Sequence, residues 1–529
     1  MAAVTASTDG AKPSNIPPGR PNNLTEEQEE KLKQMWKLLF RLFNVGTLAE
    51  ANGDAPASPT ASASADKADQ SKKKSRFGFL SRKKNEDIPE NPLSPGAQAV
   101  ADTIGSSNDA ANDKFGQSKQ FREALAQETP ENMRSAFWTM AKHDHPDGIL
   151  LRFLRARKWD VNAALIMSIS AQHWRAKEYK VDQDIMVRGE EGALLDSEGK
   201  EEGANDSKKK TDGKDFIQQY RMGKSYLHGF DKEGRPISVV RVRLHRGGEQ
   251  TNDALERYTV HLIETGRLLL RDNVDTSTIV FDMTDFTLAN MDYTPVKFMI
   301  KCFEANYPES LGTILIHRSP WIFQGIWKII KPWLDPVVAA KVHFTSNNSD
   351  FSQFVDPKNA PKELGGEEEW TYKYIEPQAG ENDKKKDAET RAKIQEERDA
   401  IVKEYETATL AWIDGDKSQA GKRNELAATL SKNYWKIDPY VRARTLYDRL
   451  GVLGPEGKLN FYPERTPPVS EKKSEESEPK DSGVETKPDV VDIPKDTTVE
   501  TTADGVDPNE KAVDAAKGNV VPLPATAAS

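Results

Sequence analysis

The pattern of apolar and polar positions predicts helices at both ends of the chain and an α/β region between them. Near the N-terminus, one apolar stripe recurs at three- and four-residue steps: Leu32, Met35, Trp36, Leu39, Leu42 and Phe43. This spacing predicts an amphipathic helix over residues 24–46, ended by Gly46. Thr25 followed by Gln28 is a capping-box pattern that marks its start. The apolar stripe requires a partner surface.

From Phe216 onward, short β-branched runs alternate with helical patterns. Five runs are predicted strands: 225–230, 237–242, 277–282, 313–317 and 342–345. The first two are joined by a hairpin-type turn, and helices are predicted over residues 255–270 and 295–306, the second capped by Thr294. Strands that alternate with helices favour a largely parallel sheet. We therefore predict an α/β fold with a mixed sheet lined by helices.

One helix of this region is apolar on nearly every side. Its apolar residues are Trp321, Ile322, Phe323, Ile326, Trp327, Ile329, Ile330, Trp333 and Leu334. A helix of this kind is usually either core or in contact with lipid, and this one is too short to span a bilayer. Two interpretations stay open. Periodicity favours a fully buried core helix, and the alternative is a movable wall over an apolar cavity that can touch a membrane.

Helical patterns flank the α/β region on both sides. Residues 119–185 predict an N-terminal helical lobe, and residues 388–453 predict an accessory helical lobe that bundles with the Trp36 helix. A Gly/Glu/Lys/Asp-rich insertion over residues 189–214 is predicted to be a mobile surface loop. Three polar, low-complexity stretches are predicted to be disordered, the second of them a linker: 1–23, 47–118 and 463–529.

The predicted linker carries a basic and aromatic segment over residues 72–84. Its cationic and aromatic residues are Lys72, Lys73, Lys74, Arg76, Phe77, Phe79, Arg82, Lys83 and Lys84. Each cation near an anionic lipid surface contributes about 1 kcal/mol to binding. Adhesion to a membrane is therefore one interpretation. A nuclear-import signal and a solvated charge run are the alternatives.

Composition limits the class of protein. The chain has 529 residues and a net charge of -9, and this mild acidity argues against nucleic-acid binding. The single cysteine, Cys302, excludes an intramolecular disulfide and a thiolate metal cluster. The sequence shows neither a secretory signal nor a run of about 20 apolar residues that could span a membrane. We expect a cytoplasmic protein that contacts membranes peripherally.

The motifs that could carry catalysis are weak. Residues 223–225 end like a phosphate loop, but the first glycine of that motif is absent, and no Gly-x-Ser-x-Gly elbow is present. The His143-Asp144-His145 triplet has no companion cluster, so we interpret it as a surface turn and predict no metal site. These observations predict a protein that is not an enzyme.

A charged set remains near the apolar helix: Arg157, Lys158, Glu309 and Lys341. Cations of this kind bind phosphate, and a carboxylate accepts hydrogen bonds from hydroxyl groups, so the set suits a phosphoester head group. By spacing alone, a structural ion pair between Glu309 and Lys341 is the favoured alternative.

Five motifs resemble signatures of the CRAL-TRIO lipid-binding family, in the same order. They are residues 150–160 (LLRFLRARKWD), 231–236 (DKEGRP), 307–309 (YPE), 331–336 (KPWLDP) and 364–366 (LGG). The resemblance covers roughly residues 120–376. It is nearest to the yeast phosphatidylinositol transfer proteins, and within them to a non-classical fungal branch with extra N- and C-terminal helices.

The resemblance implies that residues 119–185 form the N-terminal lobe of the family and residues 215–376 its lipid-binding domain. A hydrophobic pocket then holds one lipid, phosphatidylinositol, as ligand, and no cofactor is implied. The implied gate is the apolar helix, through Trp321, Phe323, Ile326, Trp327, Ile330, Trp333 and Leu334. The implied inositol-phosphate ligands are Arg157, Lys158, Glu309 and Lys341.

The implied function is transfer of phosphatidylinositol between membranes, with presentation of the lipid to lipid kinases. Endosome, endoplasmic reticulum and lipid droplet are the candidate membranes. A threonine of the family's inositol site is Val338 here. At the choline-lipid site Ser277 is kept, but a threonine falls on Ile279 and tyrosines fall on Leu227 and Ser238. This drier pocket suits a second ligand such as a sterol or squalene, so a carrier or sensor of a neutral apolar ligand stays open. So does a scaffold or GTPase-regulating module.

Overall fold

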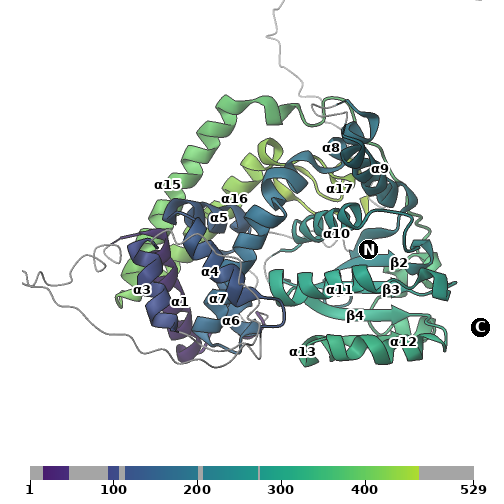
Figure 1. The fold of residues 1–529 in the computed structure, drawn as a ribbon, viewed down its shortest axis with the longest axis horizontal. Helices are drawn as coiled ribbons and strands as arrows, with labels where there is room; N and C mark the ends of the chain where they lie inside the picture. Colours follow the sequence, from purple (N-terminus) through teal and green to yellow (C-terminus); the bar gives the residue numbers. More distant parts are fainter. Residues whose placement is uncertain (1–15, 47–92, 106–112, 201–205, 272–273, 464–529) are drawn as a thin grey trace, which may run out of the picture. The chain divides into compact units, whose positions relative to one another are not determined.

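The computed structural model describes residues 16–46, 93–105, 113–200, 206–271 and 274–463 (Figure 1). The basic and aromatic segment over residues 72–84 lies outside the described residues, as does nearly all of the predicted tail. Residues 16–23, which we predicted to be disordered, have a defined structure. Within them, Arg20 forms an ion pair with Asp275 at 3.2 Å.

A five-stranded sheet in the order β1-β2-β3-β4-β5 forms the centre of the α/β region. The strands are β1 (Ser225–Phe230), β2 (Pro236–Arg241), β3 (Ser277–Asp282), β4 (Leu311–His317) and β5 (Val342–Thr345). β1 and β2 pair antiparallel, with Tyr226 opposite Val239, and all other neighbours pair parallel. The predicted mixed, largely parallel sheet is therefore confirmed, and each predicted strand lies within two residues of its observed bounds.

The two faces of the sheet pack against different parts of the chain, because successive side chains of a strand point to opposite faces. Val280 and Leu315 pack against a C-terminal segment that contains α14 (Asn348–Phe351). Ile279 and Ile314 face the other way, into a cluster with residues of the apolar helix. The helices on this second face are α10 (Asn252–Arg267), α11 (Tyr293–Lys301), α12 (Phe323–Ile330) and α13 (Pro336–Ala339). Asp292, rather than Thr294, caps α11.

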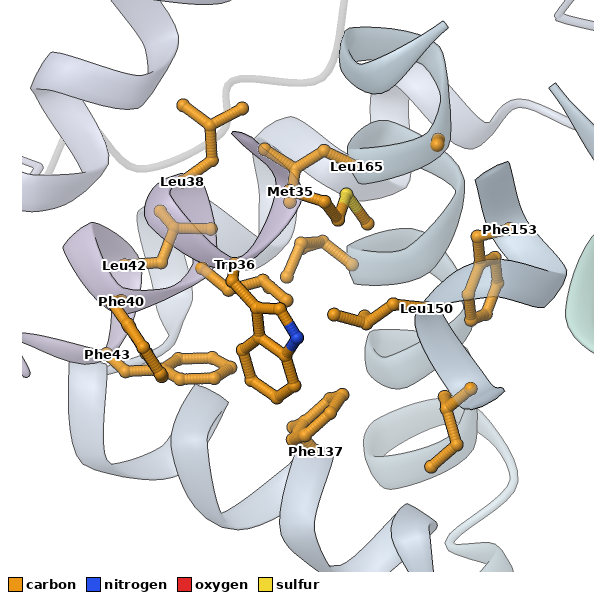
Figure 2. Close-up of a cluster of buried hydrophobic side chains, with 14 of the residues drawn as sticks. Met35, Trp36, Leu38, Phe40, Leu42, Phe43, Phe137, Leu150, Phe153 and Leu165 are labelled. Atoms are coloured by element: carbon orange, nitrogen blue, oxygen red, sulfur yellow. The ribbon is translucent and has the colours of Figure 1, made fainter. Parts of the chain in front are cut away.

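The N-terminal helices, including the helix that carries Trp36, share one core. They are α1 (Glu26–Phe43), α3 (Pro95–Ile104), α4 (Gln117–Gln127), α5 (Pro130–Ala141), α6 (Pro146–Ala156) and α7 (Val161–His173). The predicted capping box of α1 is present, although Asn44 rather than Gly46 caps its end. Figure 2 shows the fully buried ring of Trp36 directed toward Phe137. Its Nε1 donates a hydrogen bond to Asp147 Oδ1 at 2.7 Å.

The helices at residues 388–453 pack in part into the same core as the Trp36 helix. They are α15 (Ala388–Ile413), α16 (Gln419–Val441) and α17 (Leu446–Arg449). Apolar residues of α15 and α16, such as Val402 and Leu430, belong to the same core as Trp36. Asp147 joins these elements, because it accepts hydrogen bonds from Trp36 and from Tyr405 Oη at 3.0 Å and pairs with Arg423. The predicted contact of α1 with this region is confirmed, but α1 also packs against α3, α5, α6 and α7.

Two segments that we predicted to lack structure contain helices. α8 (Val187–Glu198) and α9 (Ser207–Met222) occupy most of the predicted mobile insertion, and α3 lies within the predicted linker. In α8, Glu190 is fully buried and pairs with Arg449, and it accepts hydrogen bonds from Leu446 N at 2.8 Å and Tyr374 Oη at 2.9 Å. Its partners lie far along the chain, so composition alone could not reveal that this charge is buried.

The buried His261 of α10 makes the fold sensitive to acid. Burial, together with nearby arginines such as Arg257, lowers the pKa of His261 to about 3, and its Nδ1 is bonded to Tyr220 Oη at 2.6 Å. The unfolded chain binds a proton near pH 6.5, so this stability is present above that pH and is lost as the pH falls toward 3. The loss at pH 5 is about 2 kcal/mol. We expect the melting temperature of the His261→Gln variant to fall less between pH 7 and pH 5 than that of the wild type. The exposed His343→Gln is the control, and an equal fall in all three proteins would contradict the prediction.

Candidate functional site

An apolar cavity of about 270 Å³ lies between the second face of the sheet and helices α10, α11 and α12. It is far larger than the roughly 30 Å³ that one water occupies in the liquid. Its lining includes Ile279 of β3, Ile314 of β4, Leu262 of α10 and Phe303 after α11. Protein interiors are otherwise close-packed, so a space of this size lined by apolar groups suits an apolar ligand.

Helix α12 forms one wall of the cavity and also an outer surface. Phe323 and Ile330 are buried and line the cavity, together with Trp327 and Leu334. Ile326 is buried beside them, whereas Trp333 is half-buried with its ring 5.4 Å from that of Tyr293. On the outside, Trp321 is 87% exposed and Ile329 is 50% exposed. The interpretation as a fully buried core helix is therefore wrong, and movement of this wall stays a prediction.

The three residues that we predicted for the pocket, Ser277, Ile279 and Val338, all line the cavity. Leu227 and Ser238, at the positions of the family's tyrosines, also line it. Ile279 and Val338 contribute no hydrogen-bonding group. This part of the cavity wall therefore suits an acyl chain or another apolar group better than a polar one.

Two of the predicted head-group residues, Lys341 and Glu309, adjoin the end of the cavity where the parallel strands begin. Lys341 Nζ donates a hydrogen bond to the carbonyl of Leu311, the first residue of β4, at 2.8 Å. Glu309 directly precedes Ser310, which lines the cavity together with Leu311. Arg157 ends α6 and donates to Gln117 Oε1 at 2.5 Å, and Lys158 beside it is exposed. As far as the chain is described, the lining itself includes none of the four predicted residues.

Glu309 is held by its backbone and not by an ion pair. It has a positive φ of 55°, and its carbonyl accepts a hydrogen bond from Arg152 Nη1 at 2.9 Å. In the described part of the chain, no ion pair joins Glu309 to Lys341, so the structural pairing favoured by spacing is wrong. The contact with Arg152 instead fastens α6 to the turn that precedes β4.

Sequence reasoning missed two residues that hold this end of the cavity together. Arg152 lies in the same LLRFLRARKWD motif as Arg157, but we predicted no separate role for it. Gln117 accepts from Arg157 and donates from Nε2 to the carbonyl of Ala305 at 3.3 Å. The motif was the only signal that could have identified Arg152, and no local pattern marks Gln117.

The His143-Asp144-His145 triplet is not a surface turn. His143 is buried, its ring lies 4.9 Å from that of Trp435, and burial lowers its pKa to about 4. Among the described residues, no group of three His, Cys, Asp or Glu side chains could hold a metal ion. In the same residues, no helix has both the length and the apolar character required to cross a membrane.

Comparisons with known proteins identify the family to which the chain belongs. The CRAL/TRIO domain matches residues 220–366, and the CRAL/TRIO N-terminal domain matches residues 117–168. A CRAL-TRIO domain-containing protein of Schizosaccharomyces pombe is 42% identical over 443 residues, which are 83% of this chain and 93% of that protein. The phosphatidylinositol transfer protein CSR1 of Eremothecium gossypii is 38% identical over 450 residues, which are 82% of this chain and 98% of that protein. The chain therefore belongs to the CRAL-TRIO family.

Proposed function

We propose that this protein binds phosphatidylinositol in the apolar cavity and transfers it between membranes. The observation that carries the proposal is the cavity itself, bounded by a helix with an exposed outer side and adjoined at one end by Lys341. The similarity to the Eremothecium phosphatidylinositol transfer protein supports this choice of lipid. Presentation of the bound lipid to a lipid kinase belongs to the same proposal, with the exposed Lys158 as part of the surface that a kinase would meet.

The physics of lipid exchange explains why head-group contacts matter. Each buried CH₂ group is worth about 0.8 kcal/mol relative to water. The bilayer offers nearly the same environment as the cavity, so the acyl chains contribute little to the balance between the two. Selectivity must then come from polar contacts such as those that Lys341 and Glu309 can make with phosphate and hydroxyl groups.

The exposed side of α12 is the proposed membrane contact. We expect Trp321→Ala to weaken binding to liposomes, because a tryptophan with an apolar body and a polar N–H is favoured at the boundary between lipid and water. The thermal unfolding of the variant should be unchanged, since the side chain is 87% exposed. Co-sedimentation with phosphatidylcholine–phosphatidylinositol liposomes measures the effect, and the exposed Lys432→Ala on α16 is the control. Wild-type co-sedimentation of Trp321→Ala would exclude this surface as the contact.

A second candidate function is transport or sensing of a neutral apolar ligand. The apolar character of Ile279 and Val338 in the cavity lining favours it. Such a ligand would need no cationic partner. Its binding should therefore not change when the charged residues at the end of the cavity are replaced.

Mass spectrometry of the ligand that co-purifies with the protein tests the two functions. The protein is purified from a fungal host as the wild type and as the Arg157→Ala and Lys341→Ala variants. Phosphatidylinositol in the wild type and its loss from the variants would support transfer of that lipid. A sterol or squalene in all three proteins, with no phospholipid, would reject it and favour the carrier.

A further inference from the structure

A second, smaller cavity of about 40 Å³ adjoins the apolar one. Arg267, Leu270 and Ser310 line both cavities, so the two spaces meet at these residues. Each enclosed water needs about 10–15 Å³. The smaller cavity therefore has room for a few waters, or for one group of similar size that carries several oxygens.

Three buried donors in the lining of this smaller cavity have no hydrogen-bond partner among the residues that the structure describes. They are Trp174 Nε1, Asn306 Nδ2 and Tyr307 Oη. Their residues are 1%, 8% and 7% exposed, respectively. A buried polar group without a partner is costly, and folded proteins normally supply one. Because each of these atoms can donate, one acceptor-rich group in the cavity would serve all three.

The charge around the smaller cavity favours an anion. Arg175 is held by Glu264 at 2.5 Å and by Asp182 at 2.7 Å, and Arg267 is held by Asp144 at 2.9 Å. Arg152 is different, because its bond is to a backbone carbonyl, that of Glu309. In the parts of the chain that the structure describes, no carboxylate lies within ion-pair distance of Arg152. Its charge helps to lower the pKa of the Asp144 and Asp275 carboxyls from beyond that distance, and an anionic group in the cavity can be its direct partner.

We propose that the smaller cavity binds an oxyanion, and that its occupant is the phosphodiester of the phospholipid whose chains fill the apolar cavity. The inference rests on the proposed function, because it requires a bound phospholipid. Ser310 and Arg267, which line both spaces, mark where the glycerol backbone passes from one to the other. Tyr307 is two residues from Glu309 on the same turn, so a phosphate beside Tyr307 directs the inositol ring toward the predicted head-group residues.

Tyr307→Phe tests the site with little risk to the fold, since it removes a hydroxyl that has no hydrogen-bond partner in the described part of the chain. The probes are fluorescent phosphatidylinositol and fluorescent diacylglycerol with the same acyl chains. We expect the variant to keep the melting temperature and the diacylglycerol affinity of the wild type, and to bind phosphatidylinositol at least tenfold more weakly. Asn306→Leu should show the same loss, and Tyr440→Phe, whose hydroxyl lies outside both cavities, should bind as the wild type does.

The outcomes separate this inference from the proposed function. If the wild type binds phosphatidylinositol, Lys341→Ala weakens it and Tyr307→Phe does not, the transfer function stands and the smaller cavity holds only ordered water. If the wild type binds no phospholipid, the proposed function fails, and inorganic phosphate becomes the probe. A rise in melting temperature with phosphate that Tyr307→Phe removes would then support an oxyanion site and reject the lipid as its source. The absence of such a rise would overturn the inference altogether.

Discussion

Replacing Lys341 with alanine is expected to lower the rate of phosphatidylinositol transfer between liposomes at least tenfold. A hydrogen bond to a charged group contributes about 1.5–3 kcal/mol, and each 1.4 kcal/mol or so corresponds to a factor of ten. Within the protein, Lys341 donates a hydrogen bond to the neutral carbonyl of Leu311. The loss of stability should therefore be small beside the loss of transfer.

The transfer assay moves fluorescent phosphatidylinositol from donor to acceptor liposomes, with thermal unfolding measured in parallel. Lys432→Ala, an exposed lysine on α16, is the matched control. Arg157→Ala should also reduce transfer, but Arg157 contacts Gln117 as well, so its melting temperature must be checked before the loss is assigned to the lipid. Transfer at the wild-type rate in Lys341→Ala would remove this residue from the proposed site.

Trp36→Ala is expected to destabilise the protein by about 3–5 kcal/mol, the range for truncation of a large buried aromatic. The ring is fully buried, with the rings of Phe40 at 5.2 Å and Phe137 at 5.4 Å. Its loss also removes a hydrogen bond from the buried Asp147, which joins α1 to α15 and α16. The midpoint of urea unfolding measures the effect.

The same substitution at an exposed position is the control for Trp36. Trp321→Ala removes an equally large side chain from the turn before α12, but that side chain is 87% exposed, so the free energy of unfolding should change by no more than about 0.5 kcal/mol. Equal unfolding midpoints for the two variants would show that α1 is not part of the cooperative core.

Much of the fold could be predicted because its signals are local. The capping box of α1 depends on Thr25 and Gln28, three residues apart, and the structure contains it. The five strands were recognisable as short apolar runs between turns and helices, and they lie where the runs do. A capping hydrogen bond and an alternation of apolar and polar residues each depend on residues close together in the sequence. Such signals can therefore be recognised without knowledge of the rest of the chain.

The candidate site could be predicted only in part. The motifs that contain Arg157 and Glu309 approach the same end of the cavity, but spacing suggested an ion pair between Glu309 and Lys341 that does not form. Distance along the chain does not determine distance in space when a helix, a turn and a strand meet from separate segments. The unpartnered donors of Trp174, Asn306 and Tyr307 were not predictable from the sequence. Whether a donor has a partner depends on all the groups that pack around it in the folded chain.

The sequence by itself determined the order of the five strands, the capping box of α1, the presence of the apolar helix and the family resemblance. The tertiary structure alone decided which charges are buried and where the space for a ligand lies. Glu190 is the clearest case: it occurs in a segment with the composition of a loop, yet it lies at the centre of contacts with Tyr374, Leu446 and Arg449. The physical reason is that a buried charge is stable only with its partners in place. Here those partners come from positions more than 180 residues away along the chain.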